Sequence, residues 1–155
     1  MARKENKCAV DSTILSTVIH PALKEYFTYR FYKLAIRLRA DVNDALEKHG
    51  ILGIHLGIMR VLEIEDAASQ IALGRSLGID KATMVKLLDD LEKSGLVQRV
   101  AAEADRRIKY IRLTAKGVKL LRLATKVRES VEKHFFRALS EEECAALDRT
   151  LSKLI

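Results

Sequence analysis

The stretch LVQRVAAEADRRIKYIRLTAKG, residues 96–117, places two short runs of alternating apolar and polar residues around a small loop. Residues 96–100 and 108–113 alternate as β-strands do, and the loop of residues 101–107 that joins them ends in Asp-Arg-Arg. Elsewhere the apolar residues recur at the three- and four-residue spacing of helices. The sequence therefore predicts one isolated β-hairpin in a mainly α-helical protein.

The residues before the hairpin predict two helices joined by a tight turn. Ser69 is expected to cap a first helix over residues 70–77, and Gly78 is expected to end it. Three apolar residues would form the buried face of this helix: Ile71, Leu73 and Leu77. Only the turn Gly78-Ile79-Asp80 then separates it from a second helix, for which Asp80 is the expected cap.

The second helix is expected to run from Asp80 to about Ser94. Its inward-facing residues would be Met84, Leu87, Leu88 and Leu91. The opposite stripe would consist of Thr83, Lys86, Asp90 and Lys93. Two helices joined by so tight a turn form a helix-turn-helix, whose second helix is the candidate reader of the DNA major groove. With the hairpin directly after it, the motif becomes a winged helix-turn-helix.

Long helices are expected on both sides of this unit. Pro21 opens a helix over residues 21–49, which would be roughly 40 Å long at about 1.5 Å per residue. Thr114 is expected to cap another helix, and Ser140 with Glu143 forms a capping box for the last one. These helices are longer than the small winged unit needs. That length favours an intertwined two-fold interface over packing within one chain, although both remain open.

The predicted fold class is a mainly α winged helix-turn-helix with a two-stranded β wing and long N- and C-terminal dimerisation helices. A short helix over residues 54–63 would lie between the first long helix and the helix-turn-helix. The expected organisation has four parts: an N-terminal tail or short extra helix (1–20), a dimerisation helix (21–49), a DNA-binding lobe (50–113) and C-terminal dimerisation helices (114–155).

Length and composition exclude several classes of protein. The chain has 155 residues, of which 32% are charged and 48% hydrophobic, and this suits an ordinary soluble domain. No run of eighteen apolar residues and no convincing secretory signal is present, so we expect a cytoplasmic protein. Cys8 and Cys144 lack metal-ligand spacing, and we expect no metal and no cofactor. Because no nucleophile elbow, Gly-rich phosphate loop or HExxH motif occurs, an enzyme is not expected.

Two segments resemble the DNA-binding core of the MarR family of bacterial transcription regulators: SQIALGRSLGIDKATMVKLLDDLEKSGLVQR (69–99) and DRRIKYIRLTAKG (105–117). The wing pattern of that family is Asp-x-Arg, a strand, then Leu-Thr-x-x-Gly, and five residues match it in order: Asp105, Arg107, Leu113, Thr114 and Gly117. The resemblance is strong over residues 50–117 and looser over the first and last helices. It implies an obligate homodimer, joined through those helices, that binds a pseudo-palindromic operator in double-stranded DNA. Such regulators usually repress until a small anionic or phenolic ligand, or an oxidant, releases them.

The predicted elements and the resemblance together give the candidate DNA contacts. They are Gln70, Lys81, Ala82, Thr83, Lys86, Arg99, Asp105, Arg106 and Arg107. Arg106 and Arg107 would reach phosphates or the narrow minor groove from the wing tip, and Asp105 would hold them in place. A solvated surface explains four further cations equally well: Arg75, Lys93, Lys109 and Arg112.

Three residues of the second helix depart from the family pattern. Ala82 and Asp90 replace a small hydroxyl residue and a basic residue, and Val85 stands where Thr or Ser is frequent. An acidic side chain near phosphates weakens binding, and Ala reads at most a thymine methyl group. The operator therefore cannot be taken from relatives. A winged-helix protein-interaction module that does not bind DNA remains an alternative, which the salt dependence of binding would separate from DNA recognition.

Ligand sensing rests on fewer residues. Tyr26, Tyr29 and His55 are the candidate residues of an effector cavity, in which aromatic walls and a few polar groups would suit a small aromatic or anionic effector. Packing in the core or at an interface explains these residues more simply. A cysteine-based redox-sensing regulator is a second alternative, because Cys8 follows several cations and positive charge stabilises a thiolate. Cys144 is expected to pack as a small hydrophobe.

Overall fold

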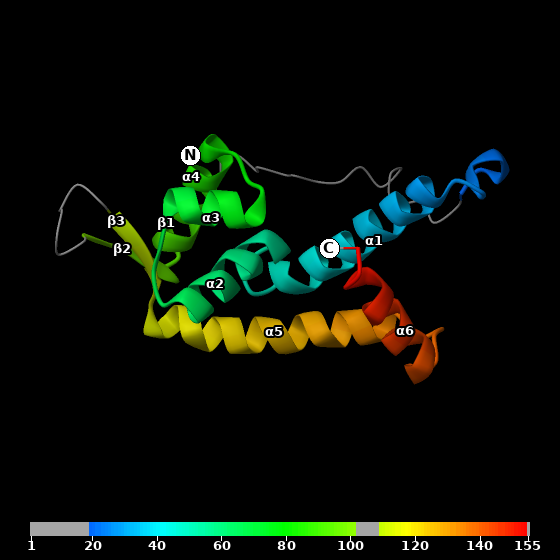
Figure 1. Cartoon of the computed structure of the whole chain (residues 1–155). Helices are drawn as coiled ribbons and strands as arrows, with labels where there is room; N and C mark the ends of the chain where they lie inside the picture. The colour runs from blue at the N-terminus through cyan, green and yellow to red at the C-terminus, as the bar shows by residue number, and fades with distance from the viewer. Residues whose placement is uncertain (1–18, 102–108, 155) are drawn as a thin grey trace, which may run out of the picture.

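The computed structural model describes residues 19–101 and 109–154 and shows a mainly helical chain with one small antiparallel sheet (Figure 1). Its elements in chain order are η1 (Pro21–Leu23, a 3-10 helix), α1 (Phe27–Glu47), α2 (Gly53–Glu65), β1 (Ala68–Ser69), α3 (Gln70–Leu77), α4 (Lys81–Lys93), β2 (Val97–Ala101), β3 (Lys109–Leu113), α5 (Ala115–Phe135) and α6 (Glu141–Leu151). We use the term winged lobe for α2, α3, α4 and the sheet, which lie at one end of α5 (Figure 1). The predicted fold class is confirmed.

The sheet contains three strands in the order β1-β3-β2. β2 and β3 pair antiparallel, from Val97 opposite Leu113 to Ala101 opposite Lys109, which confirms the predicted hairpin. β1 pairs with the other edge of β3, so that β2 is an edge strand on its outer side. The sequence does not reveal β1, because two residues are too few to show an alternating pattern.

The core lies where the helices of the winged lobe, the sheet and α5 meet. Its fully buried side chains include Ile58, Met59, Leu62, Leu73, Met84, Leu88, Leu91, Ile111 and Leu121. The inward face predicted for α4 is confirmed, with Leu87 packed at the margin of the core. The prediction that Ile71 is buried is wrong, since the residue is 63% exposed. Residues two positions apart on a helix point to opposite sides, and Leu73 takes the inner side of α3.

The first long helix begins later than predicted. Pro21 opens a separate 3-10 turn, in which His20 Nδ1 accepts a hydrogen bond from the Ala22 N–H at 3.3 Å. Tyr26 then adopts an extended conformation, with φ −80° and ψ 106°, and α1 starts only after it. A single helix over residues 21–49 is therefore wrong. The fixed φ of proline suits the first turn of a 3-10 helix as well as that of an α-helix.

α1 and α5 pack along each other and extend away from the winged lobe, with α6 at the far end of α5 (Figure 1). The predicted capping box of α6 is confirmed: Ser140 Oγ accepts from the Glu143 N–H at 3.2 Å, and Glu143 Oε2 accepts from the Ser140 N–H at 2.8 Å. The start of α1 projects far from the winged lobe (Figure 1). None of the described helices is long and apolar enough to cross a membrane.

The start of α5 is joined closely to the turn that follows α4. Thr114 Oγ1 accepts a hydrogen bond from the Gly117 N–H at 3.0 Å and donates one to the Gly95 carbonyl oxygen at 2.7 Å. The Thr114 N–H also donates to the Leu96 carbonyl oxygen at 3.0 Å. A Cβ on Gly117 would lie 2.1 Å from that same oxygen, so only glycine allows the two backbones to come this close. We call this contact the α5 joint.

Gly117→Ala is expected to lower the free energy of unfolding by about 3 kcal/mol, because the added methyl group overlaps a backbone carbonyl that cannot move aside freely. Gly57→Ala is the matched control, since Gly57 also lies within a helix but a Cβ there meets nothing within 4 Å. Because alanine has a higher helix propensity than glycine, Gly57→Ala should raise the free energy of unfolding by up to about 1 kcal/mol. Urea unfolding of both variants measures the difference, and equal stabilities would contradict this description of the α5 joint.

Candidate nucleic-acid interface

α3, the following turn and α4 form the expected helix-turn-helix. Ser69 Oγ caps α3 by accepting from the Ala72 N–H at 3.2 Å, and Gly78 ends α3 with a left-handed φ of 64°. Asp80 Oδ1 caps α4 by accepting from the Thr83 N–H at 3.0 Å. Hydrogen bonds from the side chain and the backbone of Thr83 lower the pKa of Asp80, because they stabilise the charged carboxylate. Each cap predicted for this motif is confirmed.

α4 presents a polar face to solvent. Its exposed residues are Lys81, Ala82, Thr83, Lys86, Asp90 and Lys93, and this set includes the whole predicted polar stripe. In a helix-turn-helix, the N-terminal turns of the second helix are those that reach base edges. The structure places four candidate contacts in these turns: Lys81, Ala82, Thr83 and Lys86.

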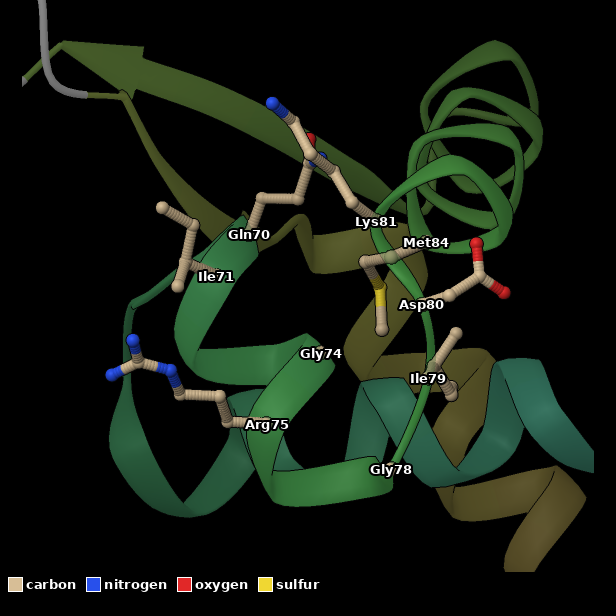
Figure 2. Close-up of a pocket in the computed structure, with 9 residues that line it drawn as sticks. All are labelled: Gln70, Ile71, Gly74, Arg75, Gly78, Ile79, Asp80, Lys81 and Met84. Carbon is tan, nitrogen blue, oxygen red and sulfur yellow. The ribbon is translucent and has the colours of Figure 1, made fainter.

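A groove of about 500 Å³ lies between α3 and the start of α4 (Figure 2). Its lining residues are Gln70, Ile71, Gly74, Arg75, Gly78, Ile79, Asp80, Lys81 and Met84. Figure 2 shows the side chains of Gln70 and Lys81 directed toward one end of the groove and that of Arg75 toward the other. Gln70, the candidate contact on α3, is thus brought into one surface with the start of α4.

Arg99 lies at the base of the hairpin and is bound to α4. Its Nη2 donates to Asp89 Oδ1 at 2.6 Å, its Nη1 donates to Glu92 Oε2, and its backbone N–H donates to Glu92 Oε1 at 3.2 Å. Burial disfavours the charged guanidinium, but the hydrogen bonds and charges of the two carboxylates outweigh burial and raise the pKa of Arg99. Its side chain is 22% exposed. This candidate contact is therefore turned toward the protein, unlike the lysines of α4.

Some candidate residues lie outside the described residues. They are Asp105, Arg106 and Arg107, in the segment 102–108, and Cys8, in the segment 1–18.

The four cations that a solvated surface explains as well as a DNA contact are all exposed: Arg75, Lys93, Lys109 and Arg112. Arg112 Nη2 lies 3.3 Å from Asp66 Oδ2, so this side chain has an acidic neighbour within the protein. Cys144 is half-buried on α6. In the part of the chain that is described, no group of three or more His, Cys, Asp or Glu residues is placed to hold a metal ion.

His55 lies buried near the start of α2. The residue is 8% exposed, and its Nδ1 accepts a hydrogen bond from the Leu52 N–H at 3.1 Å. The proton of the neutral ring is then on Nε2, which has no hydrogen-bond partner among the described residues. Burial lowers the pKa of His55, and the negative charge of Asp90 opposes that effect only in part.

Tyr26 and Tyr29 lie far from His55 within one chain. Tyr26 is 60% exposed at the start of α1, and Tyr29 is half-buried one turn later. The start of α2 instead lies beside the end of α1, where Asn43 Oδ1 accepts a hydrogen bond from the Gly53 N–H at 2.8 Å. At a rise of about 1.5 Å per residue, roughly 21 Å of helix separates Tyr29 from Asn43. The structure does not bring the three candidate effector residues together in one protomer.

The segment that contains the helix-turn-helix is similar to known proteins. A model of the MarR family matches residues 49–108. The transcriptional regulator HosA of Escherichia coli O157:H7 is 36% identical over 86 residues, which make up 56% of this chain and 64% of HosA. The matched segment is that of a MarR-family protein. The aligned region spans 64% of the length of this relative.

Solved structures extend the likeness to the MarR-family fold over most of the chain. A mutant MarR from E. coli complexed with operator DNA gives a TM-score of 0.74 at 18% identity and covers 83% of this chain and 92% of that chain. BpsR of Bordetella bronchiseptica, whose DNA binding is regulated by 6-hydroxynicotinic acid, gives 0.75 at 20% identity and covers 88% and 96%. At such identities the likeness concerns the fold. MarR-family proteins are transcription regulators rather than enzymes, which agrees with the expectation from the sequence.

The two carboxylates that hold Arg99 are not among the candidate residues predicted from the sequence. Asp89 and Glu92 are three residues apart on α4, so they lie on one face of the helix. Gly95, with φ 68°, then turns the chain back so that β2 runs past this face. A pair of acids at this spacing before a glycine turn, with an arginine in the following strand, is the signal for an ion pair within the protein.

The stability of this chain should fall as pH drops below about 6.5, because the unfolded chain protonates His55 near its ordinary pKa while the folded chain does so only at lower pH. His55→Asn should show a smaller loss, since asparagine keeps an acceptor for the Leu52 N–H and does not titrate. Urea unfolding at about pH 7.5 and about pH 5.5 measures both proteins. The other histidines contribute equally to each, so an identical loss in both proteins would contradict the prediction.

Proposed function

We propose that this chain is a homodimeric, DNA-binding transcription regulator of the MarR type, acting in the cytoplasm, which represses its target until a small aromatic or anionic effector releases it. The observation that carries the proposal is the exposed polar face of α4, which presents Lys81, Thr83 and Lys86 in the first two turns of a capped helix. A helix of this kind fits the major groove of B-DNA. We therefore call α4 the reading helix.

The reading helix would contact DNA through charge and through hydrogen bonds. Lys81 and Lys86 would neutralise phosphates or donate to guanine, and Thr83 with Gln70 would donate to phosphates or accept from base edges. Ala82 offers only a methyl group, which suits thymine. This set has few long side chains, so much of the affinity would come from phosphate contacts and would depend on salt.

The wing would add contacts beside the reading helix. On the family pattern, Arg106 and Arg107 would reach phosphates or the minor groove, with Asp105 holding them. Support comes from the fold, since a MarR from E. coli with the same fold has been solved with operator DNA. Arg99 is not part of this contact set, because two carboxylates of the reading helix engage its guanidinium.

A second copy of the chain is the proposed dimer partner. Large apolar side chains are exposed on the long helices and near the last helix: Tyr26, Phe27, Tyr32 and Leu34 at the start of α1, and Leu151 and Leu154 at and just after the end of α6. Apolar surface of this extent is unfavourable in water and marks an interaction surface. Two-fold symmetry would bury the patch against itself and place two reading helices about 34 Å apart, on one face of DNA.

The effector site is proposed from a protein of the same fold and from one buried histidine. BpsR, which has the same fold, responds to 6-hydroxynicotinic acid, a small aromatic acid. Because Tyr26 and Tyr29 lie at one end of α1 and His55 at the other, a site that contains all three would have to be built by two chains. His55 supports such a site, since its Nε2 is a buried donor without a partner among the described residues.

Selection of random duplex DNA on the purified protein at about 100 mM salt is expected to enrich an inverted repeat. Lys86→Ala should weaken binding and reduce the salt slope of log K by about 2, since each protomer would lose one phosphate contact. Lys126→Ala is the matched control, because Lys126 is exposed on α5 away from the reading helix. A folded protein that enriches no sequence, and whose interactions do not weaken with salt, would favour the protein-interaction module instead.

Light scattering should give twice the mass of one chain for the wild-type protein. Tyr32→Glu should shift the mass to that of a monomer, because Tyr32 is 55% exposed in one chain and a charge cannot be buried in an apolar interface without a partner. Lys126→Glu serves as the control for surface charge and should remain dimeric. A dimeric Tyr32→Glu protein would place the interface elsewhere.

A further inference from the structure

The structure assigns to Arg99 a role that rests on the proposed function: we propose that it is a positioning residue, which fixes the base of the hairpin against the reading helix. The wing and the reading helix would then meet DNA as one rigid surface. Arg99 itself would not contact DNA. The assignment concerns described residues only, at the base of the wing.

The geometry joins two elements through one side chain. Asp89 and Glu92 lie one turn apart on the reading helix, and the guanidinium of Arg99 donates to both, with 2.6 Å to Asp89 Oδ1. Glu92 is engaged twice, because its other oxygen accepts from the Arg99 backbone N–H at 3.2 Å. A planar guanidinium with several donors is suited to this bridging, whereas an ammonium group forms a single point contact.

The position of β2 in the sheet explains why such a link is needed. β2 is the edge strand, paired with β3 on its inner side only. An edge strand presents unpaired backbone N–H groups, and the carboxylate of Glu92 takes up the one at Arg99. The ion pair is therefore the outer support of the strand. Without the ion pair, β2 would be held by its pairing with β3 and by the turn at Gly95.

The charges of the reading helix also favour a positioning role for Arg99. α4 carries three lysines and three acids, so its own charges cancel. Arg99 engages Asp89 and Glu92, while the side chain of Asp90 forms no ion pair or hydrogen bond among the described residues. If Arg99 reached for a phosphate instead, it would leave two carboxylates uncompensated next to DNA. Its present position is therefore the more favourable one for binding as well.

The direction in which DNA affinity changes when Asp89 or Glu92 is neutralised tests the positioning role of Arg99. Asp89→Asn and Glu92→Gln each remove a negative charge near DNA, and simple electrostatics would raise DNA affinity. A positioning role predicts the opposite, a loss of about fivefold for each variant, as expected for a partly exposed ion-pair network. Asp90→Asn is the matched control on the same helix, since the side chain of Asp90 forms no hydrogen bond or ion pair with Arg99, and it should raise affinity.

Variants of Arg99 separate positioning from a direct phosphate contact. Arg99→Lys keeps the charge but cannot bridge both carboxylates, so it should lose nearly as much affinity as Arg99→Ala. If Arg99 contacts phosphate, Arg99→Lys should bind almost like wild type and Asp89→Asn should bind more tightly. Either of these results would overturn the assignment.

Hydrogen exchange in the protein without DNA provides a readout that is independent of the proposed function. Asp89→Asn should speed exchange of the amides in β2 and β3 at least threefold, while the amides of α5 keep their wild-type rates. Uniform acceleration throughout the chain, or none in the sheet, would overturn the positioning role. If wild type and Asp90→Asn both fail to bind DNA but the exchange difference is seen, the proposed function fails and the anchoring of the wing stands.

Discussion

The close contact between the start of α5 and the turn after α4 is the constraint on which the remaining arrangement depends. Gly117 lets the two backbones approach, Thr114 links them through both its hydroxyl and its N–H, and Lys116 Nζ donates to the Ser94 carbonyl oxygen at 2.8 Å. The same turn connects the end of the reading helix to the start of β2. One contact therefore sets the direction of the reading helix and of β2 relative to α5, and in a dimer it would set the spacing between the two reading helices.

Features that depend on neighbouring residues could be predicted from the sequence. The caps at Ser69, Asp80 and Ser140 need only the next three residues, and each is found in the structure. Features that depend on distant segments could not. β1 exists because β3 offers it a pairing edge, and Arg99 is engaged because the chain turns back at Gly95. Tyr26 interrupts a helical pattern that periodicity alone extends without a break.

The acidic residues of the reading helix have different roles despite their proximity in sequence. Asp89 and Glu92 face β2 and are engaged by Arg99, whereas Asp90 lies on the exposed stripe with the lysines. The charge of Asp90 also acts on His55, the buried histidine of α2. Asp90, one of the three residues of the reading helix that depart from the family pattern, thus interacts electrostatically with a buried residue of α2. Under the proposed function, its effect on DNA affinity would add to the phosphate contacts proposed for Lys81 and Lys86.

In the proposed function, two copies of the chain read DNA with paired reading helices. The most direct measurement compares binding to an enriched inverted repeat with binding to the same repeat carrying about five or about ten extra base pairs between its half-sites. About five base pairs turn the half-sites to opposite faces of the duplex, so a rigid two-fold dimer should lose most of its affinity. About ten restore the face but lengthen the span, and the loss should persist because the α5 joint fixes the spacing. Equal affinity for all three duplexes would contradict a dimer that reads both half-sites at once.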